Sequence, residues 1–197
     1  MTTGDATNPR LILASASPRR KELLHQIGVD FRIVVADIEE IPEPDEKPDA
    51  FVLRMAREKA LEVMARETPG LPVLGSDTAV ILDGRILGKP VDRNEAVAML
   101  QSLSGRTHEV FSAVAVAVDH AEVYEVLNVT RVTFSKMELP WIETYCDTGD
   151  PMDKAGAYGV QGKAAEKISR IEGSFYGVMG LPLYETAQLL RRAEVLF

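Results

Sequence analysis

A strand, a turn and a helix are predicted near the N-terminus, and they constrain the fold of the whole chain. The apolar run 11–14 stops at the small polar run 15–17, and a helical pattern then begins. Ser17 suits the N-cap of a helix, Pro18 suits its first position, and Gly28 suits its C-terminal cap. The segment therefore predicts a strand that is followed directly by a helix.

Two arginines stand in the first turn of this predicted helix. Arg19 and Arg20 place permanent cations where the backbone N–H groups and the helix dipole favour anions. Two solvated surface arginines are the plainer interpretation. Removal of Arg20 is expected to stabilise the ligand-free protein slightly, because an unpaired cation then leaves the helix N-terminus. The alternative is a bound polyphosphate, because free amides, a serine-rich turn and two guanidinium groups match its oxygens.

Composition and charge exclude several classes of protein. The 197 residues are 46% hydrophobic and 26% charged, which is ordinary for a soluble globular protein of one domain or two packed lobes. A net charge of −8 without a long basic run argues against general binding to nucleic acid or to anionic membranes.

The cysteine content and the N-terminus indicate a cytoplasmic protein. Cys146 is the only cysteine, so a disulfide framework and a thiolate metal cluster are excluded, and we interpret it as a small buried hydrophobe. The first ten residues lack the pattern of a signal peptide, and no stretch approaches the roughly 18 apolar residues of a membrane span.

Both strands and helices are predicted along the rest of the chain. The predicted strands are 31–35, 72–82, 85–87, 107–118 and 121–135, and the predicted helices are 49–66, 92–103, 138–146 and a last one from Leu183. The pair Asp83-Gly84 predicts a hairpin turn. An acidic loop, 36–40, follows the first of these strands, and a turn rich in small residues is expected over 171–182.

Two charged residues fall inside otherwise apolar elements. Lys59 lies one turn from Met55 and Val63, so it can point toward the sheet, although a lysine that snorkels to solvent is the alternative. Asp77 interrupts an apolar strand, where a carboxylate needs a cation, hydrogen bonds or a metal, because burial of an unpaired charge is costly. A loop aspartate that caps its own turn is the alternative for Asp77.

A glycine-rich stretch, 153–162, is unlike a core element. It holds three glycines together with Lys154 and Gln161. Such a loop lets backbone amides approach a ligand closely, and it supplies one cation and one amide side chain.

The residues that do not suit a hydrophobic core form a set suited to phosphoryl chemistry. They are the cations Arg19, Arg20, Lys59, Lys89 and Lys154, the acids Glu40 and Asp77, and Gln161. Cations would bind phosphate charge, and carboxylates would serve a divalent ion and an activated water. No serine or cysteine nucleophile with a paired base is evident, so direct attack by water is favoured. The three histidines show no i, i+4 spacing, which argues against a histidine metal site.

Several contiguous words of this sequence resemble the Maf-like nucleoside triphosphate pyrophosphatases. They are Ala14-Ser15-Ala16-Ser17-Pro18-Arg19-Arg20, Ala56-Arg57-Glu58-Lys59-Ala60, Gly75-Ser76-Asp77-Thr78, Leu87-Gly88-Lys89-Pro90, Leu103-Ser104-Gly105-Arg106-Thr107-His108, residues 153–162, and Gly173-Ser174 with Gly180-Leu181-Pro182-Leu183. These words run in order over nearly the whole chain.

The resemblance implies both a fold and a reaction. The fold is α/β, with a mixed twisted sheet flanked by helices in two closely packed lobes around a central cleft, and residues 1–197 form a single domain. The reaction is hydrolysis of a nucleoside triphosphate at the α-phosphate, with a divalent metal such as Mg²⁺ or Mn²⁺. A homodimer is common in the family.

The resemblance also assigns roles to individual residues. It makes Asp77 the proton acceptor, with Lys59 and Arg20 as the other catalytic residues. The residues that it places on the substrate are Ser15, Ser17, Arg19, Arg20, Lys59, Thr78, Lys89, Lys154 and Gln161, and base preference falls to Arg20, Thr78 and Gln161. Glu40 and Asp77 would bind the metal. Glu39 is the alternative to Glu40, since the family often has aspartate before the last glutamate of this loop.

The sequence of residues 153–162 resembles the branch of the Maf-like family that acts on dTTP and UTP, rather than the branch that acts on 7-methyl-GTP. We therefore expect a pyrophosphatase for dTTP, UTP and modified pyrimidine nucleotides. The alternative is a nucleotide-binding regulator of cell division and septum formation in which hydrolysis is incidental. The presence of Asp77 favours the enzyme, because a protein that only binds nucleotides needs no base.

Overall fold

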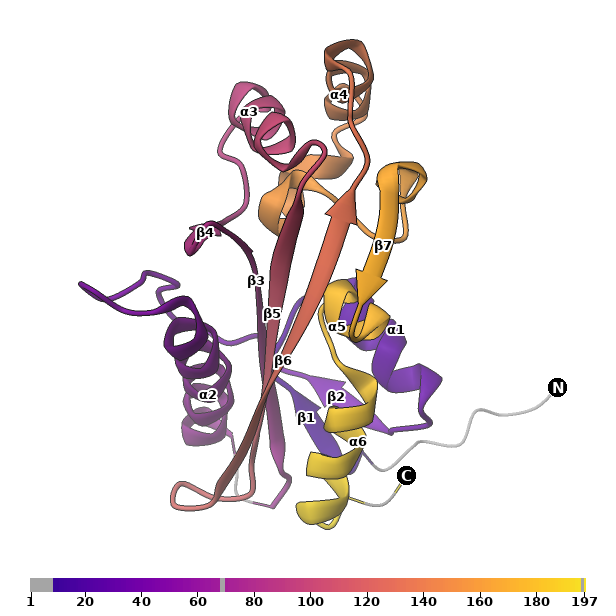
Figure 1. Ribbon diagram of the computed structural model, residues 1–197. Helices are drawn as coiled ribbons and strands as arrows, with labels where there is room; N and C mark the ends of the chain where they lie inside the picture. The colour runs from indigo at the N-terminus through magenta and orange to yellow at the C-terminus, as the bar shows by residue number, and fades with distance from the viewer. Residues whose placement is uncertain (1–8, 68–69, 196) are drawn as a thin grey trace, which may run out of the picture.

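The structure, a computed structural model, describes residues 9–67, 70–195 and 197 (Figure 1). The first eight residues, where no signal peptide is expected, lie outside these ranges. The strands are β1 (Leu11–Leu13), β2 (Phe31–Ile33), β3 (Val73–Leu82), β4 (Arg85–Leu87), β5 (Thr107–Ala117), β6 (Val123–Phe134) and β7 (Ile168–Glu172). The α-helices are α1 (Pro18–Gln26), α2 (Pro48–Arg66), α3 (Arg93–Leu103), α4 (Leu139–Cys146), α5 (Phe175–Met179) and α6 (Leu183–Arg192). Three short 3₁₀ helices are η1 (Asp150–Asp153), η2 (Ala155–Ala157) and η3 (Lys163–Lys167).

All seven of these strands belong to one mixed sheet. The order is β2-β1-β3-β5-β6-β7, and β4 pairs with β3 off this path. β1 is parallel to β2 and β3, whereas the other pairs are antiparallel. A mixed sheet flanked by helices was expected, and this expectation is confirmed.

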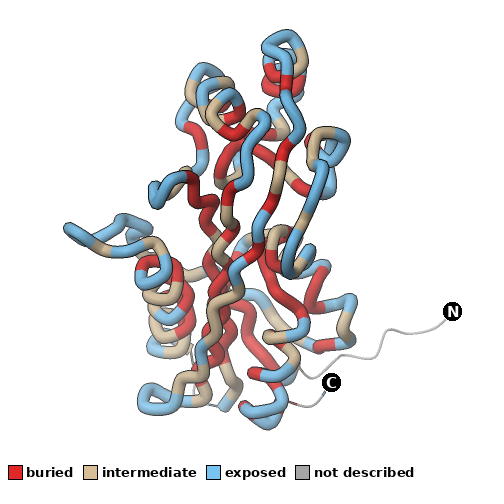
Figure 2. Tube along the Cα trace, in the orientation of Figure 1, coloured by how far each residue is buried: buried red, intermediate tan, exposed pale blue. Residues whose placement is uncertain are grey.

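Two lobes share this sheet (Figure 1). In the lobe that we call the α2 lobe, α2 covers one face of the sheet, and α1, α5 and α6 cover the other. In the α3 lobe, α3 and α4 pack with η2 around a separate cluster that includes Leu100, Phe134 and Tyr145. Figure 2 shows buried residues where the helices face the sheet. In the described ranges, no helix combines the length and the apolar character that crossing a membrane requires.

Local signals account for the first helix and the first hairpin. The backbone N–H of Arg20 donates to the Ser17 hydroxyl, so Ser17 caps α1 as expected. Asp83 and Gly84 both have positive φ, at 52° and 75°, which suits the tight turn between β3 and β4.

Two elements differ from the sequence prediction. The stretch 171–182 was expected to be a turn, but β7 ends inside it and α5 follows. β7 is an edge strand with mostly exposed side chains, so its apolar alternation is weak. α5 has only five residues, and Ser174 caps it by accepting from the Gly177 N–H. Helical periodicity is not detectable over so short a segment.

The middle of β3 lies against α2 at a glycine. A Cβ atom on Gly75 would lie 2.1 Å from the Ala56 carbonyl oxygen and 2.7 Å from the Ala60 nitrogen. Only a residue without a side chain allows this approach. Asp77, two residues further along β3, therefore lies on the same face of the strand as Gly75, and its side chain points toward α2.

We predict that Gly75→Ala destabilises the protein by at least about 2 kcal/mol, because backbone atoms of α2 must move to admit the methyl group. The measurement is the free energy of unfolding in urea. Gly88→Ala is the matched control, since a Cβ there would meet nothing within 4 Å. An equal effect of both substitutions would show that the packing of β3 on α2 is looser than described.

Candidate active site

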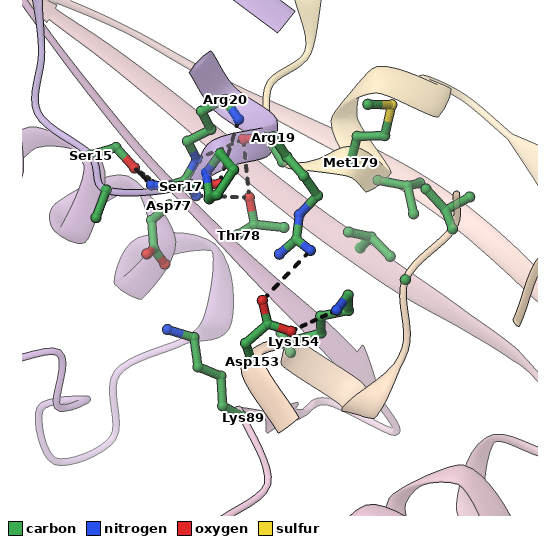
Figure 3. A pocket seen from close by; sticks show the side chains of 18 of the residues that line it. Ser15, Ser17, Arg19, Arg20, Asp77, Thr78, Lys89, Asp153, Lys154 and Met179 are labelled. Atoms are coloured by element: carbon green, nitrogen blue, oxygen red, sulfur yellow. Dashed lines mark hydrogen bonds and ion pairs between the residues drawn. The ribbon is translucent and has the colours of Figure 1, made fainter. Parts of the chain in front are cut away.

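A cleft of about 650 Å³ lies between the two lobes. Its walls come from the turn between β1 and α1, the acidic loop, α2, β3, the glycine-rich loop and the end of α5. It is lined by each of the residues that the sequence singled out: Ser15, Ser17, Arg19, Arg20, Glu40, Lys59, Asp77, Thr78, Lys89, Lys154 and Gln161. Figure 3 shows several of them facing the same space. The volume is within the usual range for a site that binds a small molecule.

Lys59 and Asp77 form a buried ion pair in this cleft. The residues are 7% and 8% exposed, and the Lys59 Nζ atom donates to Asp77 Oδ1 over 2.7 Å. The same ammonium lies 2.7 Å from Glu40 Oε1. Lys59 therefore does not snorkel to solvent, and Asp77 is not a loop residue; both of the plainer interpretations are wrong.

Glu40 remains ionised beside these residues. Partial burial alone would raise the pKa of Glu40. The hydrogen bond from Lys59 and the charges of Lys59, Lys89 and Arg20 outweigh this effect and hold the pKa below its usual value. Of the two glutamates in the acidic loop, Glu40 lines the cleft and Glu39 does not.

Arg20 is held by the protein rather than solvated. Its Nε donates to the Gly180 carbonyl over 3.0 Å, and its two terminal nitrogens donate to Ser15 Oγ and Thr78 Oγ1 over 3.2 and 3.3 Å. Desolvation lowers the pKa of this guanidinium, and the charges of Asp77 and Glu40 oppose that effect. The premise that Arg20 is an unpaired cation at the helix N-terminus is therefore wrong, and its removal would break these three hydrogen bonds.

A carboxylate joins cations from both sides of the cleft. Asp153 Oδ1 accepts from Lys154 Nζ over 2.6 Å, and Asp153 Oδ2 lies 4.0 Å from the Arg19 guanidinium (Figure 3). Lys154 also donates to the Asp150 carbonyl and to Asp150 Oδ1, over 2.5 and 3.0 Å. Sequence reasoning missed both acids: Asp153 stands next to Lys154 in the stretch 153–162 that it had singled out, and Asp150 lies three residues before that stretch.

The glycines of this loop make room for that network. A Cβ atom on Gly159 would lie 2.8 Å from Lys154 Cε, and one on Gly162 would lie 3.2 Å from Asp150 Oδ2. Side chains at these two positions would press on Lys154 and Asp150, so glycine leaves room for their ion pair even before a ligand is considered.

Tyr158 is a further residue of the cleft wall that sequence reasoning missed. It is buried, and its hydroxyl lies 2.7 Å from the Nε2 atom of the buried His108. Burial lowers the pKa of His108 to about 4 and raises that of Tyr158, so both are neutral at pH 7. The feature of the sequence that could have indicated this pair is His108, a histidine at the start of a buried strand.

The carboxylates of the cleft fit a hard divalent cation that completes its shell with other oxygens. Glu40 and Asp77 both contact Lys59, so they already share one cation. Among the described residues, no group of three or more His, Cys, Asp and Glu side chains could hold a metal by itself. Mg²⁺ is typically bound through one or two carboxylates together with water and substrate phosphate.

Comparison with known proteins adds evidence from the whole chain. Residues 10–193 match the family described as Maf-like protein. The chain is 52% identical to a dTTP/UTP pyrophosphatase of Bordetella avium (strain 197N), over 95% of this chain and 96% of the relative. It is 54% identical to a dTTP/UTP pyrophosphatase of Methylobacillus flagellatus, over 97% and 96%.

A solved structure supports the fold. A HAM1 protein from Coxiella burnetii superposes with a TM-score of 0.51 over 93% of this chain and 99% of that one. The sequence identity is 17%, so this likeness concerns the arrangement of the chain alone.

We predict that Arg20→Ala lowers the stability of the ligand-free protein by about 1 to 3 kcal/mol, because the Gly180 carbonyl and the Thr78 hydroxyl lose a charged donor. Thermal and urea unfolding would measure the change. Lys21→Ala is the control, since Lys21 is exposed in the next position of α1. A more stable Arg20→Ala protein would mean that repulsion by the helix dipole exceeds the value of these hydrogen bonds.

Proposed function

The chain belongs to the Maf-like protein family, and from that premise we propose that it hydrolyses dTTP and UTP. The products are the nucleoside monophosphate and pyrophosphate, and the reaction is attack of water at the α-phosphate. The observation that carries this proposal is the buried pair of Lys59 and Asp77 in a cleft that gathers phosphate-binding cations. Modified pyrimidine nucleotides would belong to the same substrate class.

In this proposal, Asp77 accepts the proton of the attacking water. A carboxylate that is held in place is suited to this role, and Lys59 holds Asp77 by donating to its Oδ1 atom. Arg20 and Lys59 then stabilise the negative charge that develops on the phosphate oxygens. Because Arg20 is anchored by three hydrogen bonds, its guanidinium need not be reorganised during the reaction.

The triphosphate would lie along the N-terminus of α1. Arg19 and Arg20, with the hydroxyls of Ser15 and Ser17, line this end of the cleft. Lys89 lies opposite them and is exposed, so it can turn toward a phosphate (Figure 3). Lys154 would join the set if a phosphate oxygen replaced the Asp153 carboxylate beside it.

The metal would be held by Glu40 and Asp77. Bound there, Mg²⁺ or Mn²⁺ would polarise a phosphate oxygen and lower the pKa of a bound water. The charge of Lys59 between the two carboxylates keeps both of them near one another before the ion arrives.

Two wider properties follow from the family and are part of the proposal. We propose that the protein works as a homodimer, and that it works in the cytoplasm on the free nucleotide pool. The acidic net charge of −8 supports a small-molecule substrate rather than a nucleic acid.

Hydrolysis in water enriched in ¹⁸O tests the reaction. A panel of nucleoside triphosphates with Mg²⁺ or Mn²⁺ should give turnover that is fastest for dTTP and UTP. The label should enter the monophosphate, because water attacks the α-phosphate. Label in the pyrophosphate would place attack at the β-phosphate instead. Tight binding without turnover would favour the regulator of cell division.

We predict that Asp77→Asn lowers kcat by at least about 100-fold, because the amide cannot accept the proton of water. Binding of a non-hydrolysable UTP analogue, measured by calorimetry, should change little. Asp83→Asn is the matched control, since Asp83 is an exposed carboxylate in the turn after the same strand. Retention of more than about a tenth of wild-type kcat, a change of roughly 1.4 kcal/mol in barrier, would remove Asp77 from the role of base.

Gln161 is proposed to read the pyrimidine. It is exposed on the glycine-rich loop and lines the cleft. Its amide offers a donor beside an acceptor, and the edge of uracil or thymine offers N3–H beside carbonyl oxygens. Guanine instead offers two donors, which a carboxylate would match better.

We predict that Gln161→Glu lowers kcat/KM for UTP by roughly 1 to 3 kcal/mol in transition-state binding, since an acceptor then faces a carbonyl. The ratio of kcat/KM for UTP and GTP measures the effect. Gln101→Glu, on the exposed face of α3, controls for the added charge. An equal loss for both nucleotides would mean that Gln161 only supports the loop.

A further inference from the structure

Ser112 lies behind the wall of the cleft and is hydrogen-bonded to a residue that lines it. Ser112 is fully buried on β5, directly opposite Thr78 on β3. The two hydroxyl oxygens are 2.8 Å apart. Thr78 in turn accepts from the guanidinium of Arg20 over 3.3 Å. A serine outside the cleft is therefore only two hydrogen bonds from a cation inside it.

The direction of each hydrogen bond in this chain follows from a count of protons. The Ser112 hydroxyl lies 2.7 Å from the Gly177 carbonyl oxygen, which can only accept. Ser112 therefore donates its single hydrogen to that oxygen. In the bond between the two hydroxyls, Thr78 must then be the donor. Its lone pairs are left to face Arg20, which can only donate. The order of donation is therefore Arg20 to Thr78, Thr78 to Ser112, and Ser112 to the Gly177 carbonyl.

Thr78 has one competing acceptor. The Gly180 carbonyl lies 3.5 Å from the Thr78 hydroxyl, but it already accepts from Ser76 over 3.2 Å and from Arg20 over 3.0 Å. If Thr78 turned its hydrogen to this carbonyl, two oxygens with only lone pairs would face each other 2.8 Å apart. Ser112 thus selects one of two orientations of the Thr78 hydroxyl.

We propose that Ser112 is a positioning residue for the reaction. By accepting the hydrogen of Thr78, it leaves both the lone pairs of Thr78 and the Gly180 carbonyl free to accept from Arg20, and so keeps the guanidinium in the orientation that meets the triphosphate. The proposal rests on the proposed function, in which Arg20 binds and stabilises the phosphates. Ser112 itself touches neither the substrate nor the reacting atoms.

A double-mutant cycle tests the proposal. Ser112→Ala should lower kcat/KM for UTP about tenfold in the wild-type background. Without Ser112, the Thr78 hydroxyl is no longer oriented, and the hydrogen bond from the charged Arg20 to Thr78 is weakened. In a Thr78→Val background the same substitution should change kcat/KM by less than about twofold, because no hydroxyl remains to be oriented. A serine with a structural role alone would have the same effect in both backgrounds.

Two further variants sharpen the cycle. Ser112→Thr keeps the hydroxyl and should retain most of the kcat/KM that Ser112→Ala loses. Ser104→Ala is the matched control, because Ser104 also donates to a backbone carbonyl, that of Met137, but lies in the α3 lobe. It should leave kcat/KM unchanged in both backgrounds. Thermal unfolding of each variant reports the stability cost separately, and Ser112→Cys replaces Ser112→Ala if the alanine variant does not fold.

The outcomes separate this proposal from the proposed function. An equal loss in both backgrounds, or no loss in either, would overturn the role of Ser112 while turnover by the wild type still supports the enzyme. If the wild type lacks turnover, the proposed function fails. The same cycle is then read from the Kd of a non-hydrolysable UTP analogue, with coupling supporting the role of Ser112 and additivity overturning it.

Discussion

The ammonium of Lys59 between Asp77 and Glu40 is the interaction on which the rest of the cleft depends. A lone carboxylate in the middle of β3, or a lone lysine on the inner face of α2, would carry a large cost of desolvation. Together they are tolerated, and Gly75 allows α2 to come close enough for the pair to form. The pair then brings the acidic loop to the cleft through Glu40. One buried cation thus joins a helix, a strand and a loop that are distant in the sequence.

Two other cations of the cleft, Arg20 and Lys154, follow the same physical rule, in that each is held against protein acceptors. Arg20 has a carbonyl and two hydroxyls, whereas Lys154 has two carboxylates and a carbonyl. Such contacts limit the repulsion among like charges that gather in one cleft, and they fix where each charge lies. A polyanion entering the cleft therefore meets charges that are already in place, which reduces the cost of organising the site around it.

Much of the site could be predicted because its residues violate local rules. Asp77 breaks an apolar strand, and Arg19 and Arg20 oppose a helix dipole, so each stands out without knowledge of the fold. The partners of these residues could not be predicted. The carbonyl that binds Arg20 belongs to Gly180, 160 positions away, and Ser112 looks like any serine in a buried strand. β7 and α5 were missed for a related reason, since an exposed edge strand and a single capped turn depend on tertiary packing more than on pattern.

The continuity of the sheet determines how the cleft can respond to its contents. β3 and β5 pair without interruption from Val73 with Ala117 to Ile81 with Glu109, and Asp77 lies in the middle of that ladder. Because the same strands serve both lobes, the walls cannot swing on a linker as two rigid bodies do; any change of width has to bend a hydrogen-bonded ribbon. The backbone of the sheet thus keeps the width of the cleft nearly constant. Adaptation to one nucleotide or another is left to loops and side chains at its rim.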